Sequence, residues 1–265
     1  MSADNVWEAY AIRYAHHERL ARENFLGPLP SDIHDSPMPL DYFVWAVKSA
    51  SGRNFVIDTG FDETMARKRQ REFLHSPGEG LQAVGIEPGR VEDVIVSHMH
   101  YDHCGNHAMF PNARYHVQDR EMMFSTGRSM CHAHQRFPFD AEDVIAMVRR
   151  LFDGKLVFHD GDAEIAPGLS LHYVGGHSMG LQMVRVNTRR GWVVLATDAA
   201  HLYANMERDT PYPILYNVAE VLEGYRRAYA LASSPGHVIP GHDPLVLARY
   251  PPPSPKLQNW IARLD

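Results

Sequence analysis

One short segment of the chain carries four potential metal-binding side chains within six consecutive positions. It reads H-x-H-x-D-H, with His98, His100, Asp102 and His103 as candidate ligands, and it follows the apolar, strand-like residues 94–96. Because side chains alternate along a strand, His98 and His100 would point to the same side and could bind one ion. Asp102 and His103 are neighbours, so they reach a common ion only if the chain turns into a helix there. The motif therefore predicts two metal ions.

Three more candidate ligands come later, each beside an apolar, β-like run and in a turn-prone context. They are His177, Asp198 and His242. A catalytic metal site is expected on loops that a rigid sheet holds in place. Burying seven such groups without partners would be very costly, so a plain polar cluster in the core is the weaker interpretation.

In this order, the motifs resemble those of the metallo-β-lactamase superfamily over nearly the whole chain, and residues 55–60 are similar to the family's early strand ending in Asp-x-Gly. The resemblance implies an α/β fold, a four-layer αβ/βα sandwich of two mixed β-sheets packed face to face with helices outside, forming a single domain over residues 1–265. It also implies a role for each candidate residue: His98, His100 and His177 bind the first metal, Asp102, His103 and His242 bind the second, Asp198 bridges the two, and Asp58 braces the metal-binding loops.

Within the superfamily, the resemblance is closest to the compact branch of quorum-quenching N-acyl-homoserine lactonases. The commonest zinc β-lactamases usually lack the His that follows the motif Asp and carry Cys at the bridging position, so His103 and Asp198 argue against antibiotic hydrolysis. Only residues 243–265 follow the last ligand, too few for the helical domain of glyoxalase II-like enzymes. Neither an added domain nor a basic surface, which RNA-processing members need, is apparent.

One position departs from the lactonase pattern. Quorum-quenching lactonases carry a Tyr three residues after the bridging Asp, where this chain has His201, and Tyr203 follows two residues later. Both side chains are candidates for contacting the substrate. The resemblance suggests that Asp102 passes a proton to the leaving alkoxide. The motif also ends in C-G-N, where the lactonases more usually have A-G-G.

The expected chemistry is hydrolysis without a Ser or Cys nucleophile. Two divalent ions bridged by a carboxylate lower the pKa of a shared water to about 7, and the resulting hydroxide attacks a lactone carbonyl that one ion polarises. Zinc suits such a site, with manganese, iron or cobalt as alternatives. We therefore expect opening of a lactone ring, either of an acyl-homoserine lactone or of a lactone in a catabolic pathway. Hydrolysis of another ester, a thioester or a phosphodiester is the alternative, and a metal-binding or sensing protein without turnover is a third hypothesis.

The composition of the chain excludes other classes of protein. The net charge of −6 argues against non-specific nucleic-acid binding. The sequence contains neither a long apolar run nor a signal peptide, and its two cysteines argue against a disulfide framework, so a reducing cytoplasm is expected. The expected partner is a small-molecule lactone or ester, and neither nucleic acid nor membrane is expected. A homodimer is possible.

The remaining histidines have ordinary interpretations. His132 and His134, with Cys131, could imitate a soft-metal site, but no partner motif follows, and a loop lining the substrate pocket is the preferred interpretation. Surface or polar-core positions are expected for five others: His16, His17, His75, His159 and His172. Cys104 is expected to be a small buried neighbour of the metal loop.

The elements that must position these residues follow from periodicity and end signals. Strands of a first sheet are predicted over 6–14, 42–48, 53–58 and 113–118, and strands of a second sheet over 156–158, 169–174, 183–187 and 192–196. Helices are predicted over 64–73, 81–85, 141–152 and 219–233, with a further short helix after the prolines at 251–253. Asp140 should cap the helix over 141–152, with Asp143 completing a capping-box-like pair.

Overall fold

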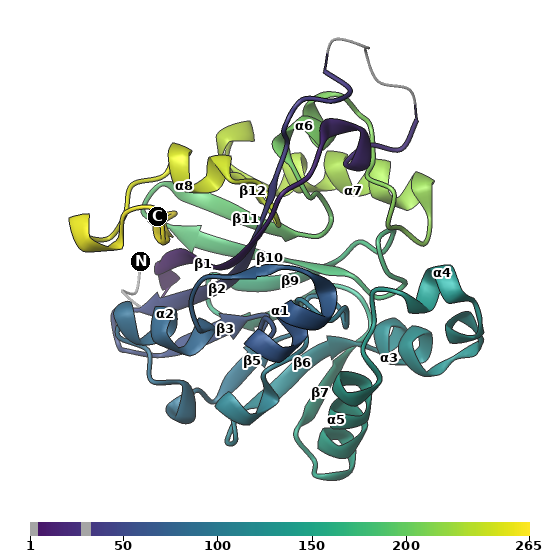
Figure 1. Ribbon diagram of the computed structural model, residues 1–265. Coiled ribbons are helices and arrows are strands. Elements are labelled where there is room, and N and C mark those ends of the chain that lie inside the picture. The colour runs from purple at the N-terminus through teal and green to yellow at the C-terminus, as the bar shows by residue number, and fades with distance from the viewer. Residues whose placement is uncertain (1–4, 28–32) are drawn as a thin grey trace.

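A computed structural model describes residues 5–27 and 33–265 of the protein. Two β-sheets form its centre, and helices lie on their outer faces (Figure 1). This α/β arrangement of two mixed sheets with helices outside confirms the predicted fold class. Among the described residues, no helix is both long enough and apolar enough to cross a lipid bilayer.

Within the described residues, the first sheet has eight strands, in the order β13-β1-β2-β3-β5-β6-β7, with β4 paired to β1. The strands β13, β1, β2 and β3 are antiparallel neighbours, whereas β3, β5, β6 and β7 run parallel. The strand bounds are β1 (Trp7–His17), β2 (Leu40–Ser49), β3 (Asn54–Ile57), β4 (Glu72–Phe73), β5 (Asp93–Ile95), β6 (Arg114–Gln118), β7 (Leu156–His159) and β13 (Ile261–Arg263).

The second sheet has five strands within the described residues, in the order β12-β11-β10-β9-β8. All of its pairs are antiparallel except β11 with β12, which is parallel. The strand bounds are β8 (Ala163–Ala166), β9 (Leu169–Tyr173), β10 (Gln182–Thr188), β11 (Gly191–Thr197) and β12 (Val238–Pro240).

The first sheet is buried on both faces, and its strands show why. On β1, Ala9 and Ala11 belong to the core between the two sheets, whereas Tyr10 and Ile12 belong to the core beneath the outer helices. This alternation follows from the period of two along a strand. Because both faces are covered, the middle of the strand, from Ala9 to Ile12, is apolar on both faces instead of alternating with polar residues.

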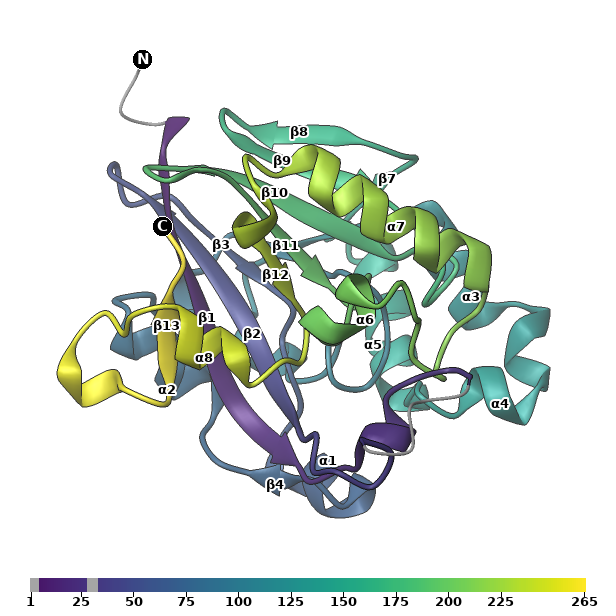
Figure 2. The same cartoon turned by 90° about the horizontal axis from the view of Figure 1, so that it is seen from above.

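The helices cover the outer faces of the two sheets. The helix α7 (Val218–Leu231) lies along the second sheet (Figure 2) and buries Val221, Tyr225 and Ala228, whose spacing places them on one helical face. The side chain of Asn217 caps its first turn. The other helices are α1 (Glu63–Arg69), α2 (Pro77–Ala83), α3 (Asp119–Thr126), α4 (Ala133–Arg136), α5 (Ala141–Phe152), α6 (Tyr203–Glu207) and α8 (Leu245–Arg249).

Two sequence expectations about the early helices are wrong in extent. The helix predicted over 64–73 ends at Arg69, because Gln70 adopts a left-handed conformation with φ of 57° and the chain returns as β4. The helix predicted over 81–85 is α2, which begins four residues earlier. Its start is set by Ser76 and Glu79, which form a reciprocal capping box around Pro77 at the first helical position.

Two other expectations are wrong in placement. Residues 156–158 do form a strand, but β7 pairs in parallel with β6 in the first sheet and not with the second sheet. The chain between β6 and β7 includes α5, so it crosses over and returns to the same sheet. After residues 251–253, the structure has only a 3₁₀ turn (Pro255–Leu257), followed by the edge strand β13 instead of a helix.

The expected capping pair at α5 is only half formed. Oδ1 of Asp140 accepts a hydrogen bond from the backbone N–H of Glu142 at 3.1 Å. Asp143 does not return a bond to Asp140, and its buried Oδ2 has no partner among the described residues. An aspartate side chain is one methylene shorter than the glutamate of an ordinary capping box.

Candidate metal centre

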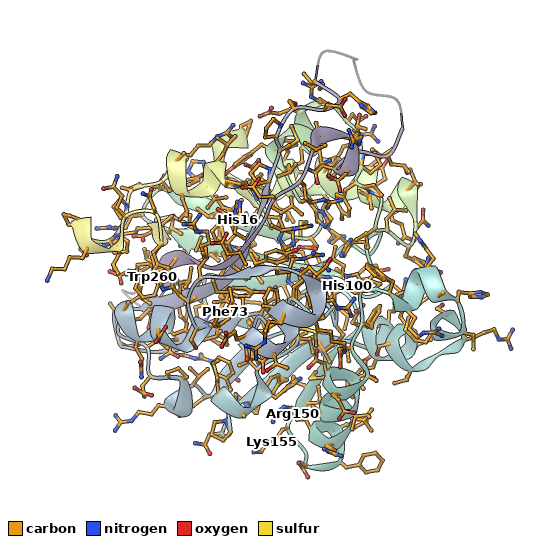
Figure 3. All side chains as sticks on the ribbon, viewed as in Figure 1. His16, Phe73, His100, Arg150, Lys155 and Trp260 are labelled. Carbon is orange, nitrogen blue, oxygen red and sulfur yellow. The ribbon has the colours of Figure 1, made fainter. Side chains whose placement is uncertain are left out.

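The candidate ligands lie on four loops, each just after the end of a strand. The H-x-H-x-D-H segment follows β5, His177 follows β9, Asp198 follows β11 directly, and His242 follows β12. The seven side chains are therefore contributed by both sheets, and His100 lies near the middle of the molecule, where the sheets meet (Figure 3). They form two groups, within each of which the potential ligand atoms lie within 4.8 Å of one another.

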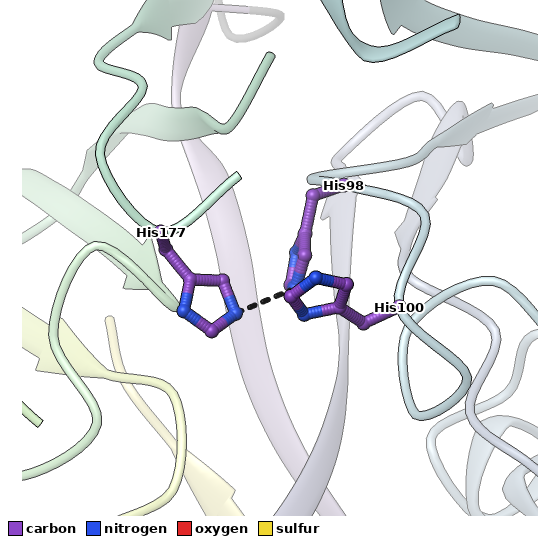
Figure 4. A group of neighbouring side chains, drawn as sticks. All are labelled: His98, His100 and His177. Atoms are coloured by element: carbon purple, nitrogen blue, oxygen red, sulfur yellow. Dashed lines mark hydrogen bonds between the residues drawn. The ribbon is translucent and has the colours of Figure 1, made fainter. Parts of the chain in front are cut away.

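The first group consists of three buried imidazoles, His98, His100 and His177 (Figure 4). Nδ1 of His177 donates to the carbonyl of Ile214 at 2.7 Å, and Nδ1 of His98 lies 3.0 Å from the hydroxyl oxygen of Ser97. That hydroxyl donates its hydrogen to Asp58, so it accepts from His98. The Nε2 atoms of His98 and His177 are then both acceptors, and they face each other at 3.1 Å. Two facing lone pairs repel each other unless a cation lies between them.

The second group consists of Asp102, His103, Asp198 and His242. Nδ1 of His103 donates to Asp58 at 2.7 Å, and Nδ1 of His242 donates to the carbonyl of Asp41 at 2.9 Å. Their Nε2 atoms lie 3.2 Å and 3.0 Å from Oδ1 of Asp198. Nε2 of His103 and Oδ1 of Asp198 are buried without hydrogen-bond partners in the described part of the chain.

Asp198 lies between the two groups. Its Oδ2 is 3.2 Å from Nε2 of His177, and its Oδ1 is 3.0 Å from Nε2 of His242. The backbone before it is strained, because the β-branched Thr197 has a positive φ of 47°. Gly241 packs closely against the Asp198 side chain, and a Cβ added at Gly241 would lie 2.6 Å from Oδ1 of Asp198.

These donors fit divalent metal ions. Histidines that bind metals donate their second ring N–H to a carboxylate or a carbonyl, as His103, His177 and His242 do here. Imidazole and carboxylate ligands suit zinc and related ions. The inward-facing acceptors in both groups lack a donor that could satisfy them, and bound cations would fill that need.

The electrostatics of the first group agree with this protonation pattern, whereas in the second group Asp198, Asp102 and Asp58 outweigh burial and raise the pKa of His103. Burial, reinforced by neighbouring imidazoles, holds the pKa of His98 well below its usual value, so this ring is neutral. Burial alone would raise the pKa of Asp198, but the surrounding His103, His242 and His201 lower it overall. Asp198 is therefore a carboxylate that bound ions would stabilise further.

Asp58 braces the first metal-binding loop from behind. Its Oδ1 accepts from the backbone N–H of Ser97 at 2.7 Å, and its Oδ2 accepts from the Ser97 hydroxyl at 2.8 Å and from His103. It is fully buried, and it has a positive φ of 61°. One carboxylate thus orients the loop and one of the imidazoles.

Glu121 has a similar position, which the sequence analysis missed. This buried carboxylate on α3 accepts from the backbone N–H of Met99 at 2.7 Å, from the hydroxyl of Ser178 at 2.7 Å and from the backbone N–H of Gly180 at 2.9 Å. It thereby joins the H-x-H loop to the loop that carries His177. No motif surrounds Glu121 in the sequence, so no local signal marks it.

His201 and Tyr203 are placed in different environments. His201 is buried beside the cluster, with its Nε2 3.0 Å from Oδ2 of Asp198 and its ring stacked on Tyr212 at a centroid distance of 3.5 Å. Tyr203 lines a separate pocket, and the guanidinium of Arg249 lies 3.7 Å from the centre of its ring. The structure therefore brings His201, but not Tyr203, to the candidate metal centre.

A pocket of about 50 Å³ opens at the cluster and includes His201 and Asp102 in its wall. The exposed His132 and His134 do not line this pocket. Among the described residues, neither they nor Cys131 joins a group of three potential ligands. Besides the candidate ligands and His201, the pocket is lined by Arg19, Leu40, Tyr42, Arg71, Tyr101, Phe137, Pro138 and Ile214.

Comparison with known proteins gives one matching family and a consistent group of relatives. The family model described as the metallo-beta-lactamase superfamily matches residues 38–249. The N-acyl homoserine lactonase AiiA of Bacillus thuringiensis subsp. kurstaki is 31% identical over 133 residues, which are 50% of this chain and 48% of that protein. The chain thus spans about half the length of the first curated relatives it matches.

Solved structures show the same fold at lower identity. A quorum-quenching N-acyl homoserine lactone lactonase superposes with a TM-score of 0.72 at 22% identity, covering 90% of this chain and 93% of that chain. AidC, a dizinc quorum-quenching lactonase, superposes with a TM-score of 0.68 at 16% identity, covering 89% of this chain and 87% of that chain.

Proposed function

Because the chain belongs to the metallo-β-lactamase superfamily, we propose that it is a metal-dependent hydrolase that opens lactone rings. The observation that carries the proposal is the cluster of seven buried ligands, with acceptor atoms turned inward, at the end of a small pocket. Relatives named N-acyl homoserine lactonases support the lactone as the substrate class. We propose that residues 1–265 act as one domain on a small molecule, without nucleic acid or membrane, in the cytoplasm.

The proposed cofactor is a pair of divalent ions, with zinc favoured by the donor set and by the dizinc relative. When bound, such ions supply a Lewis acid and acidify a water at neutral pH. Each candidate ligand has one proposed place: His98, His100 and His177 would hold one ion, Asp102, His103 and His242 the other, and Asp198 would lie between them.

The protein's own side chains have three proposed tasks. Asp58 accepts a hydrogen bond from Nδ1–H of His103. It thereby holds this imidazole in the tautomer that presents Nε2 to the cluster. Asp102 lies at the pocket wall, with Oδ2 3.7 Å from Nε2 of His242, where it can deliver a proton to the departing ring oxygen. The neutral imidazole of His201, also in the wall, has one N–H, which faces Oδ2 of Asp198 and would have to turn to the substrate carbonyl oxygen in order to donate to it.

A substrate panel tests this function. The purified protein, loaded with zinc or manganese, is assayed with N-acyl-homoserine lactones, simple γ- and δ-lactones, a thioester and bis(p-nitrophenyl) phosphate, with Asp198→Ala as the blank. We expect the highest kcat/KM with a lactone. Preference for the thioester or the phosphodiester would establish the alternative hydrolase, and no turnover of any substrate with two ions bound would indicate a metal-binding protein.

A further inference from the structure

Two arginines share the pocket of the candidate metal centre. Arg19 and Arg71 line it together with the metal-binding side chains. Arg19 follows β1 and Arg71 precedes β4, and these strands pair antiparallel, with His16 opposite Glu72. Figure 3 labels His16 on β1 and Phe73 on β4. The short strand β4 thus brings two distant cationic side chains to one wall of the pocket.

Neither of these arginines forms a salt bridge within the described part of the chain. Neither guanidinium there has a carboxylate within 4.0 Å. Arg19 donates to the carbonyl of Glu23, and its buried Nε has no partner. Arg71 donates to the hydroxyl of Tyr101 at 3.2 Å and to the carbonyl of Arg69 at 2.6 Å. Carbonyl and hydroxyl oxygens satisfy N–H groups without forming an ion pair, and Glu23 stabilises the charge of Arg19 only from beyond 4.0 Å.

The effect of the two charges is visible on a neighbouring group. Burial, followed by Arg71 and then Arg19, lowers the pKa of His17 to about 4. Burial lowers the pKa of Arg19 itself, against the opposing effect of Glu23 and with a smaller contribution from Arg71. Partly buried cations are usually paired, so an unpaired couple beside a reactive centre favours an anionic ligand.

The size and lining of the pocket restrict that ligand. The volume of about 50 Å³ is small for a ligand pocket, and Tyr42, Phe137 and Ile214 lie in its wall. Arginine binds carboxylates through parallel N–H donors, and Arg19 has donors left for such a bond. A small ring with one carboxylate therefore suits the charge and needs less space than a lactone with a long acyl chain.

We propose that the substrate is a compact lactone bearing a carboxylate, which Arg19 and Arg71 bind while the ring carbonyl lies at the metal centre. This inference rests on the proposed lactone hydrolysis and narrows its substrate class. Water adds its hydroxyl to the acyl carbon, the ring C–O bond breaks, and the ring oxygen takes up a proton. The new carboxylic acid ionises, so the product is a hydroxy dicarboxylate, and one proton is released.

A matched pair of substrates tests the proposal on the whole metal-loaded protein. The substrates are 5-oxotetrahydrofuran-2-carboxylate and its methyl ester, which share the ring and differ in charge. We expect kcat/KM for the acid to exceed that for the ester by about 10- to 100-fold, as expected for charge-assisted hydrogen bonds. Equal turnover of both substrates would overturn the anionic subsite and leave lactone hydrolysis intact, whereas no turnover of any lactone would count against the proposed function.

Variants assign the effect to the two arginines. Arg19→Met and Arg71→Met should lose most of the preference for the acid, measured in each variant as the ratio of kcat/KM for the acid to kcat/KM for the ester. Arg71→Lys should retain part of the preference, because lysine keeps the positive charge but lacks the parallel N–H donors of a guanidinium. Arg67→Met, on the exposed face of α1, is the matched control and should change nothing. Preference that survives in both Met variants would overturn the assignment.

A binding measurement gives a readout that does not depend on turnover. Calorimetry with 2-hydroxyglutarate, the product of the acid substrate, should show binding to the parent and to Arg67→Met and at least about 10-fold weaker binding to Arg71→Met. Inorganic phosphate is the competing probe. Tighter binding of phosphate than of the dicarboxylate, or equal binding of the dicarboxylate to all variants, would overturn the carboxylate subsite.

Discussion

Oδ2 of Asp58 accepts a hydrogen bond from Nδ1 of His103 at 2.7 Å, in a pair that is almost completely buried. The bond assigns the proton of the imidazole to Nδ1 and leaves Nε2 as an acceptor that faces Asp198. Asp58 also accepts hydrogen bonds from the backbone N–H and the hydroxyl of Ser97. It therefore joins the strand β3 to the loop that carries most of the candidate ligands. The geometry of the cluster therefore depends on a residue outside it.

The substitution Asp58→Asn tests this dependence. An amide places a donor where the carboxylate accepts, so either Ser97 or His103 loses its partner. We expect the affinity for metal to fall about 10- to 100-fold, the usual effect of removing an orienting partner. Competition with a chelator measures it, and Glu63→Gln, exposed on α1, is the control. Unchanged affinity would contradict the bracing role.

The position of Asp198 between the two groups predicts both stoichiometry and activity. Elemental analysis of the parent should approach two equivalents of metal per chain. Asp198→Ala should lower turnover by several orders of magnitude, because the Lewis acid and the activated water are each worth several kcal/mol. A single equivalent that persists after added zinc or manganese, or an active variant with two ions bound, would show that this carboxylate does not join two ions.

The separate environments of His201 and Tyr203 predict an order of effects. We expect His201→Ala to lower the maximal rate about 10- to 1,000-fold with both metals retained, the range for losing one positioned donor. Tyr203→Phe should cost less, because Tyr203 lines another pocket. Rates and metal content measured on both variants check the order. The reverse order at equal metal content would reject the role proposed for His201.

Gly241 predicts a steric effect on the same carboxylate. A Cβ at this position would lie 2.6 Å from both Oδ1 of Asp198 and the carbonyl oxygen of Thr197, so Gly241→Ala must displace one of them. We expect weaker metal binding and a lower thermal midpoint. Gly236→Ala is the matched control, because its nearest atom lies 3.9 Å away. Equal behaviour of the two variants in metal titrations and thermal melts would show that the loop adjusts freely.

Asp143 predicts a pH effect on stability away from the metal centre. Burial, with repulsion from Asp140, raises its pKa to about 7, whereas an unfolded aspartate titrates near 4. Between about pH 4 and 7 the folded state keeps a proton that the unfolded state has lost, so this group makes stability fall as the pH rises. Asp143→Asn should therefore be more stable than the parent at pH 8, by about 1 kcal/mol, and nearly equal at pH 4. Denaturant unfolding at both pH values measures the difference, and an equal difference at both would contradict the shifted pKa.

Local sequence was sufficient to select the seven candidate ligands that the structure brings together. The reason is that metal-binding side chains in short, dense motifs at strand ends have few other uses. The fold class followed from the resemblance that these motifs carry, whereas single strands and helices followed from periodicity and end signals that are encoded within a few residues. The helix α5 has the predicted bounds for this reason.

Only the tertiary structure decided which distant groups meet. Glu121 bears no motif, yet it joins two ligand loops because α3 packs behind both. His201 and Tyr203 are two residues apart, and the start of α6 turns them into different pockets. Arg19 and Arg71 share a wall only through the pairing of β1 with β4. Strand pairing and pocket walls depend on contacts between residues far apart in the chain, which no local pattern specifies.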